Sequence, residues 1–389
     1  MRLVHTSDWH AGRQWKNVDR LGELEAVLAH LGDHLERQAA DILLVSGDVF
    51  DTGAPMADAE RVVFRFLRRV GDLGVQTVVI AGNHDSPARL AAWGQFAELA
   101  GVHVVARPAR ADAGGVLRLT TKGGETAVIA ALPFASTKDL VAAAQVAASD
   151  TGARQAYADG MRRMIEHLCA HFEGGAVNVL MAHTHLQAAV LGGSERRVHV
   201  GEQWAATPQA LPPDAHYVAL GHIHRPQNVA APSPAEYAGS PLQLDFGEEG
   251  DVKSFVVIDA VAGAPATITR VPYEGGRTLH TFALPLAELE ARADELRHAG
   301  WLRLRVPGDR PDPDLAGKVR RMLPNAVVVE VVLPEREDAD PQFTLPASDD
   351  PPRELFRAYF QGKHGREPDA AVLAAFDGLL AAADPDAAS

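Results

Sequence analysis

Short apolar runs alternate with longer amphipathic segments along the first two-thirds of the chain. The apolar runs are rich in β-branched residues and bounded by turn residues, a pattern typical of buried strands. They span residues 42–45, 77–81, 126–131, 177–182, 217–220 and 255–258. Apolar residues at helical spacing predict helices between them, over residues 23–37, 57–70 and 153–172. This alternation predicts a layered α/β domain over residues 1–273.

The pattern changes beyond residue 273. A strand, a helix and a second strand are predicted over residues 301–306, 314–322 and 326–332. These elements suffice for a small α+β domain over residues 274–335. An acidic, proline-rich stretch predicts a linker over residues 336–352. Two amphipathic runs within residues 353–389 predict C-terminal helices, over residues 354–361 and 369–381.

Composition narrows the class of protein. A chain of 389 residues with 47% hydrophobic residues can fill more than one core. The single cysteine, Cys169, excludes internal disulfides and thiolate zinc clusters, so oxygen and imidazole must hold any metal. The chain has no uncharged apolar run near 18 residues and no secretion-type cleavage site, so we expect a cytoplasmic protein without membrane contact.

The formal net charge of −14 argues against a generic nucleic-acid binder, because phosphate contacts usually need a basic surface. Acidic residues that bind metal would not count against nucleic-acid binding, because the bound cations cancel their negative charge. One face of the predicted helix at residues 57–70 is basic, with Arg61, Arg65, Arg68 and Arg69. This face is either a DNA contact or an ordinary solvated surface.

Five histidine and carboxylate motifs each follow a predicted strand. Such groups converge at the carboxyl ends of strands, where loops meet while the sheet holds them in place. Asp8 and His10, two residues apart on an extended segment, point to one side, and His222 and His224 repeat that geometry. The motifs contain Asp8 and His10; Asp48 and Asp51; Asn83, His84 and Asp85; His183; and His222 and His224.

The donor types indicate the chemistry. Asp48 follows Gly47, which permits a tight turn, and is placed to share its carboxylate between two cations. Asn83 offers a neutral oxygen. A mixture of Asp, Asn and His suits manganese, iron or zinc, and a pair of ions about 3.5–4 Å apart would clamp a phosphate and the group that attacks it. The sequence therefore predicts phosphoester hydrolysis.

All five motifs in this order resemble the calcineurin-like metallophosphoesterase family. The resemblance implies a layered β-sandwich flanked by helices, with two divalent metal ions. It implies that the first metal is held by Asp8, His10, Asp48 and His224. It implies that the second is held by Asp48 as bridge with Asn83, His183 and His222. His185 is an alternative to His183. We prefer His183 because His183 directly ends the predicted strand.

The same resemblance implies two catalytic residues that do not bind metal. His84 would stabilise charge in the transition state or donate a proton to the leaving oxygen, which suits an imidazole that titrates near neutrality. Asp85 would orient His84. Asp51 would orient a ligand or approach the substrate, or it would cap a helix.

Longer segments narrow the resemblance to the SbcD-like nucleases, namely residues 5–12, 47–53, 219–227 and 239–248. The resemblance implies a manganese-dependent nuclease for duplex DNA ends and hairpins, in DNA repair, recombination and replication. It implies a cap domain that presents DNA, a homodimer within a heterotetramer, and an SbcC-like ATPase partner. The chain itself has no nucleotide-binding G-x-x-x-x-G-K-[ST] loop.

Two other classes of function stay open. A stand-alone phosphodiesterase or phosphatase of the same fold leaves the residues beyond 273 without a purpose. A non-catalytic scaffold disagrees with the intact ligands at every motif. Incubation with manganese and either linear duplex DNA or a small phosphodiester separates these classes.

Two apolar surfaces have alternative interpretations. A stripe of leucine and valine over residues 21–35 either forms the dimer surface or packs on its own sheet. The C-terminal helices are too short to be stable alone. We expect them to bind the ATPase partner, and packing against the cap domain is the alternative.

Overall fold

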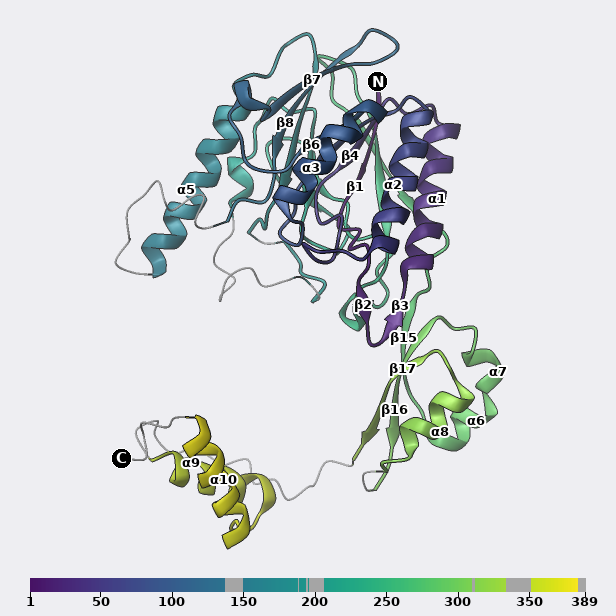
Figure 1. Ribbon diagram of the computed structural model, residues 1–389, viewed down its shortest axis with the longest axis vertical. Helices are drawn as coiled ribbons and strands as arrows, with labels where there is room; N and C mark the ends of the chain where they lie inside the picture. The colour runs from purple at the N-terminus through teal and green to yellow at the C-terminus, as the bar shows by residue number, and fades with distance from the viewer. Residues whose placement is uncertain are drawn as a thin grey trace. The chain divides into compact units, whose positions relative to one another are not determined.

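The computed structural model describes residues 1–136, 150–187, 189–193, 195, 206–309, 312–333 and 351–383 (Figure 1). The chain divides into two compact units. The first comprises Met1–Val306 and Asp312–Glu330, and the second contains the C-terminal helices. Most of the predicted linker, residues 336–352, lies outside the described residues. Within the described residues, no helix is both long and apolar enough to cross a membrane.

Two six-stranded sheets form the centre of the first unit. In the first sheet β1, β4, β5 and β6 are parallel, and β13 and β14 complete it in antiparallel pairing. Its strands, in spatial order, are β14 (Thr267–Pro272), β13 (Ser254–Asp259), β1 (Arg2–Thr6), β4 (Ile42–Val45), β5 (Gln76–Ile80) and β6 (Val102–Val105). Each strand predicted for this part of the chain is present within one or two residues.

The second sheet has the same size and a similar organisation. Four central strands are parallel, and the two edge strands β7 and β11 are antiparallel to their neighbours. In spatial order the strands are β11 (Gln227–Val229), β12 (Ala235–Tyr237), β10 (Tyr217–Gly221), β9 (Val177–His183), β8 (Thr126–Leu132) and β7 (Val116–Thr120).

Apolar side chains of the two sheets meet in one buried cluster, which explains why the strands are apolar on both faces. Helices cover the outer faces. The first sheet is covered by α1 (Leu21–Arg37) and α2 (Ala57–Asp72), and α3 (Pro87–Ala97) packs against β6; α5 (Asp150–Cys169) covers the second sheet. The result is a layered sandwich of two sheets flanked by helices, as the resemblance implies.

The apolar stripe of α1 belongs to this core. Leu24, Val27, Leu28, Leu31 and Leu35 are all buried in the cluster beneath the first sheet. Of the two interpretations of this stripe, packing on its own sheet is the one that the structure supports, and the dimer surface is not.

The basic face of α2 is paired with acidic residues. Arg65 contacts Glu25 of α1, and Arg69 contacts Asp33 and Glu36 of the same helix. These contacts join two neighbouring helices across the outer surface. They favour the interpretation of this face as an ordinary solvated surface over that of a DNA contact.

A three-stranded sheet follows in the same compact unit. Its order is β15 (Leu279–Ala283), β16 (Trp301–Pro307) and β17 (Ala326–Val332), with β15 and β16 parallel. The helices that accompany it are α6 (Leu286–Ala291), α7 (Ala293–Leu296) and α8 (Leu315–Met322). This is the small α+β domain expected beyond residue 273, and we refer to residues 274–335 as the cap.

The cap is joined to the large domain by hydrogen bonds and an apolar cluster. The Trp301 indole N–H donates to Glu23 Oε1 at 2.8 Å, and the Leu279 amide donates to Gln243 Oε1 at 2.7 Å. Leu279 also packs with Trp15 and Phe246. Trp15 lies in the small hairpin of β2 (Gln14–Trp15) and β3 (Val18–Asp19), directly after the Asp8–His10 segment.

The second unit is built on α9 (Pro352–His364) and α10 (Ala370–Ala383), close to the predicted bounds. Phe356 of α9 stacks on Phe376 of α10 with ring centroids 4.1 Å apart. Leu373 is buried between the helices, whereas Leu379 is 71% exposed. The pair therefore has a small interface of its own and leaves large apolar side chains in solvent.

Candidate metal centre

The predicted ligands meet at the carboxyl ends of strands from both large sheets. Asp8 and His10 follow β1, Asp48 follows β4, and Asn83 follows β5 of the first sheet. From the second sheet, His183 ends β9, and two further histidines follow β10, His222 and His224. Asn83 is half-buried and the other six side chains are buried. The tertiary fold thus brings all seven predicted ligands into one place.

The backbone is strained where the ligands sit. Among the described residues outside glycine, positive φ occurs at Asp8 (54°), His10 (45°), Asp48 (50°) and His222 (100°), and at three other positions. Such angles cost free energy for residues with a Cβ and concentrate at functional sites. Gly47 has φ 93°, and a Cβ at this position would collide with Nδ1 of His183, so a glycine is required there.

Three side chains form the first group, Asp8, His10 and His224. One ligand atom from each lies within 4.8 Å of the others. Nε2 of His10 and Nε2 of His224 are 3.0 Å apart and both are buried. The Asp8 carboxylate also accepts a hydrogen bond from the His222 amide at 3.0 Å, which joins the two sheets at the centre.

The second group surrounds the amide oxygen of Asn83. This Oδ1 lies 3.0 Å from Nε2 of His183 and 2.9 Å from Nδ1 of His222. The three residues come from β5, β9 and β10, so the group also spans both sheets. A nitrogen and oxygen set of this kind suits a divalent transition metal.

Asp48 lies between the two groups. Its Oδ2 is 3.6 Å from Nε2 of His10 on one side and 3.6 Å from Nε2 of His183 on the other. Its Oδ1 accepts a hydrogen bond from the His84 amide at 2.9 Å. This central position is the one expected of a carboxylate shared by two cations.

The outer ring nitrogens of three histidines are held from behind. Nδ1 of His10 lies 3.2 Å from Asp51 Oδ1, and Nδ1 of His183 lies 2.8 Å from the carbonyl oxygen of Ser46. Nδ1 of His224 lies 3.4 Å from Glu248 Oε1. Each contact leaves Nε2 directed at the centre, as in metal-binding histidines, so the residues present fit a metal.

Burial determines the protonation of the centre. It lowers the pKa of His10 to about 4 and that of His222 well below its usual value. Burial alone would raise the pKa of Asp48, but the facing His183 and His10 hold it below its usual value. Burial and the Asp48 charge raise the pKa of Asp8. Neutral imidazoles beside a carboxylate are the protonation states that bind metal.

His84 lies beside His10 and Asp48, with one ligand atom from each residue within 4.8 Å of the others, and its ring packs edge-on against that of His10 with centroids 4.7 Å apart. The predicted role of Asp85 is wrong. Nδ1 of His84 contacts the carbonyl oxygen of Asp51 at 2.7 Å, so Asp51 orients it. Asp85 instead accepts hydrogen bonds from three backbone amides, those of Val49, Phe50 and Gly82.

Two alternatives are decided by position. Asp51 does not cap α2, because that helix begins at Ala57 and Met56 is its N-cap residue. His183 is the histidine of its motif that faces Asp48 and Asn83. His185 is half-buried, and its ring centroid lies 6.3 Å from that of His222.

Sequence reasoning missed three residues that support the ligands. Ser46 acts through its backbone carbonyl, so no side-chain pattern could reveal it. Glu195 Oε1 accepts a hydrogen bond from the His224 amide at 3.1 Å. Glu248 lies within the segment 239–248 that resembles the SbcD-like nucleases, and its acidic side chain was the available signal.

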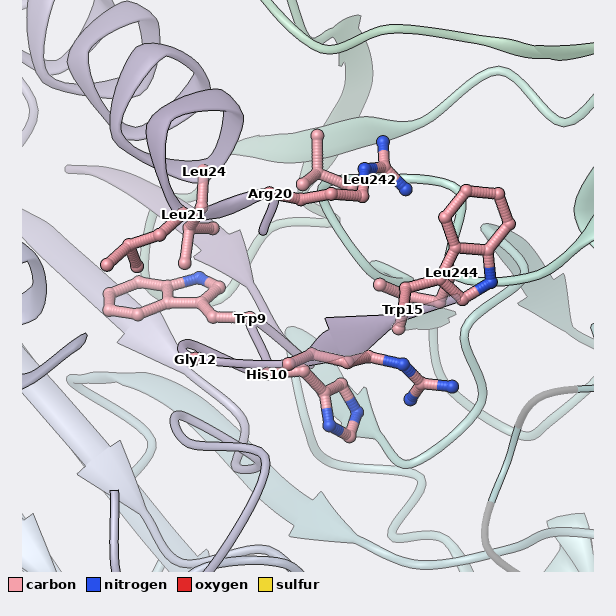
Figure 2. Close-up of a pocket in the computed structure, with 10 residues that line it drawn as sticks. Trp9, His10, Gly12, Trp15, Arg20, Leu21, Leu24, Leu242 and Leu244 are labelled. Atoms are coloured by element: carbon pink, nitrogen blue, oxygen red, sulfur yellow. The ribbon is translucent and has the colours of Figure 1, made fainter. Parts of the chain in front are cut away.

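A small pocket lies beside His10 (Figure 2). Its volume of about 20 Å³ has room for a single water molecule. Figure 2 shows the Trp9 ring pointing towards Leu21 and Leu24 of α1, while the His10 imidazole points away from them. Trp9 is 2% exposed and its indole N–H donates to Thr6 at 2.8 Å. The buried tryptophan thus anchors the segment that presents Asp8 and His10.

Comparison with known proteins agrees with this geometry. Residues 1–226 match the calcineurin-like phosphoesterase family, and residues 276–364 match the Type 5 capsule protein repressor C-terminal domain. The SbcD component of nuclease SbcCD from Bacillus subtilis is 32% identical over 86% of this chain and 87% of its own length. The protein of the same name from Rhodobacter capsulatus is 32% identical over 80% of this chain and 81% of its own length. The one from Escherichia coli K12 is 29% identical over 86% of this chain and 85% of its own length. The chain belongs to the calcineurin-like phosphoesterases and, within them, to the SbcD family of nucleases.

Proposed function

We propose that this chain is a two-metal phosphodiester hydrolase that cuts DNA. The observation that carries the proposal is the buried donor set of two groups that share Asp48 between them. In this proposal Asp8, His10 and His224 hold one divalent ion with Asp48. The other ion is held by Asp48 with Asn83, His183 and His222. Manganese is the metal that we expect from the family resemblance.

The residues of the chain have separate tasks in hydrolysis. Bound divalent ions supply the positive charge that activates water and stabilises the phosphate. Asp51 and Ser46 orient the imidazoles of His10 and His183, so that the donors are arranged before substrate binds. His84 is half-buried at the edge of the centre and holds a proton for the leaving oxygen, and Asp51 fixes its ring.

The proposed substrate is duplex DNA with ends or hairpins, and the proposed setting is DNA repair, recombination and replication in the cytoplasm. The cap supports this over a stand-alone phosphodiesterase, because a small substrate needs no additional sheet beyond the metal centre. Arg65 and Arg69 of α2 are paired with acidic residues of α1, so we do not assign DNA contacts to them. The domain bounds 1–273, 274–335, 336–352 and 353–389 are part of the proposal.

We further propose that α9 and α10 bind an SbcC-like ATPase. Tyr359 is 46% and Leu379 is 71% exposed, and Leu380 also faces solvent. Apolar side chains of this size on short helices are the usual anchors for a helix-in-groove contact. The helix pair is too small to bury them itself.

The proposed homodimer, as part of a heterotetramer with the ATPase, needs a surface other than the α1 stripe. Exposed apolar residues lie on α2, α3 and the turn η1 (Glu98–Ala100). Phe96 is 78% and Leu99 is 89% exposed, and Phe64 packs edge-on against Trp93. Charged replacements at Phe96 and Leu99 should give a folded monomer by light scattering. The control Val252→Glu, on the same unit, should remain a dimer.

The experiment that tests the activity uses the purified chain stripped with EDTA and then supplied with MnCl₂. End-labelled linear duplex, hairpin DNA and a small phosphodiester are compared as substrates. Release of nucleotides from DNA alone supports the nuclease. Efficient cleavage of the small diester with intact DNA would favour the stand-alone phosphodiesterase. Absence of cleavage on all three substrates would contradict both.

A further inference from the structure

A buried carboxylate and a buried lysine lie behind one of the metal-site histidines. Glu248 ends the short 3-10 helix η4 (Phe246–Glu248) and is 0% exposed, and Lys253, just before β13, is 8% exposed. Both lie outside the predicted ligand set. Charged groups are rarely buried unless they are paired, so the two side chains require an explanation.

Glu248 contacts the back of the His224 ring. Its Oε1 lies 3.4 Å from Nδ1 of His224. The opposite nitrogen of the same ring, Nε2, lies 3.0 Å from Nε2 of His10. The carboxylate is therefore on the side of the imidazole that faces away from the proposed metal.

Lys253 holds this carboxylate in place. Its Nζ donates to Glu248 Oε2 at 2.6 Å and to the carbonyl oxygen of His224 at 2.7 Å. The Leu244 amide donates to the same Oε2 at 3.0 Å. One lysine thus contacts both the backbone of the ligand and the carboxylate that faces the ligand's ring.

This arrangement has a direct chemical consequence. A carboxylate at Nδ1 favours the tautomer with its proton on that nitrogen, which leaves the lone pair of Nε2 free to bind a metal. The negative charge also makes the imidazole a stronger donor. Lys253 makes the buried carboxylate tolerable, because an unpaired charge in the interior is strongly unfavourable.

The other group is supported differently. Its His183 faces the neutral carbonyl oxygen of Ser46 instead of a carboxylate. We propose that Glu248, held by Lys253, is a positioning residue that sets the metal affinity of the His224 group without contacting the metal. This inference rests on the proposed two-metal site, and it predicts that loss of Glu248 weakens one metal and leaves the other nearly unchanged.

The test is calorimetric titration of MnCl₂ into the EDTA-stripped full-length chain. The parent should bind two equivalents; a parent that binds fewer would contradict the proposed two-metal function itself. In Glu248→Gln one equivalent should bind about 10–100-fold more weakly, while the other stays within about threefold of the parent. The unfolding temperature of the metal-free protein is measured beside it, because a purely structural role would change that temperature and both affinities together.

Two further variants make the result decisive. Glu236→Gln is the matched control, because Glu236 is also a buried carboxylate paired with a cation, Arg270. This variant should bind both equivalents as the parent does. The double variant of Glu248→Gln with Lys253→Met removes both charges and avoids a lone buried lysine, and it should also lose affinity at one equivalent. Parental binding of both equivalents in either folded Glu248 variant, or equal weakening of both, would overturn the inference.

Discussion

At the metal centre most of the candidate ligands are buried and held by other groups, whereas in the C-terminal helix pair Tyr359, Leu379 and Leu380 face solvent. His183 and His224 are each 1% exposed, and the outer ring nitrogen of each has a contact. Leu379 of α10 is 71% exposed. The donor groups of the centre all come from this chain, while the helix pair by itself leaves large apolar side chains uncovered.

The difference follows from how each region is stabilised. The ligands follow strands of two sheets that bury a common core, so their positions are set before any metal binds. In the part of the helix pair that the structure describes, Phe356 stacks on Phe376 and Leu373 is buried. Changes at the centre should therefore alter chemistry within an intact fold, and changes in the tail should alter binding without altering chemistry.

The largest effect is expected from Asp48→Ala. Loss of the carboxylate between the two groups should lower the cleavage rate by more than about 10²-fold and reduce bound manganese, because both ions lose a ligand. Metal content and DNA cleavage are measured together. Asp259→Ala, which removes only a surface pair with Arg2, is the control and should cleave normally. Full activity at full metal content would remove the bridging role.

His84→Ala should keep both metals and lose about 10²–10⁴-fold in rate, because general acid catalysis is lost while the ligands remain. Mass spectrometry of bound manganese and single-turnover cleavage separate the two effects. His103→Ala, at a half-buried histidine in β6, should leave both unchanged. A parallel fall of metal content and rate would instead identify His84 as a ligand, since its ring also lies near Asp48 and His10.

A smaller effect concerns the stability of the buried core towards acid. Burial lowers the pKa of His5 to about 3 from its ordinary 6.5. On acidification, His5 is therefore protonated in the unfolded chain at a higher pH than in the folded protein. The stability due to neutral His5 is complete above pH 6.5 and is lost as the pH falls towards 3. Between pH 7.5 and 5.5 this amounts to about 1 kcal/mol.

Urea unfolding of the metal-free protein at these two pH values measures the change. His5→Gln should lose about 1 kcal/mol less on acidification than the parent, since the other buried histidines are common to both proteins. Identical losses would show that His5 does not contribute to the acid sensitivity of the core.

The smallest effect on the cleavage rate is expected from removal of residues 353–389. Manganese-dependent cleavage should stay within about twofold of the parent, because the contacts described above for the metal centre all lie within the first unit. Co-purification with the ATPase should disappear, because the exposed helix pair is gone. Leu379→Glu in the full chain should weaken this binding without changing cleavage. Assembly of the truncated protein at parental affinity would exclude the helices as the main docking element.

Much of the fold was accessible from the sequence because burial on both faces of a strand leaves a continuous apolar run. The strands β4, β5, β8, β9, β10 and β13 were predicted within one or two residues. The short edge strands β7 and β11 and the helix α3 lack that pattern and were not predicted. The seven candidate ligands could be named from the sequence because a metal site of this kind needs those residue types directly after strands.

The sequence by itself determined which residue types stand directly after strands as candidate metal ligands and where the long amphipathic helices and the buried strands lie. Only the tertiary structure decided what each side chain contacts. It paired His84 with Asp51 instead of Asp85, covered the α1 stripe with its own sheet, and placed the Ser46 carbonyl behind His183. The physical reason is that periodicity along a chain reports which positions are apolar. The partner of each group depends on how separate strands come together.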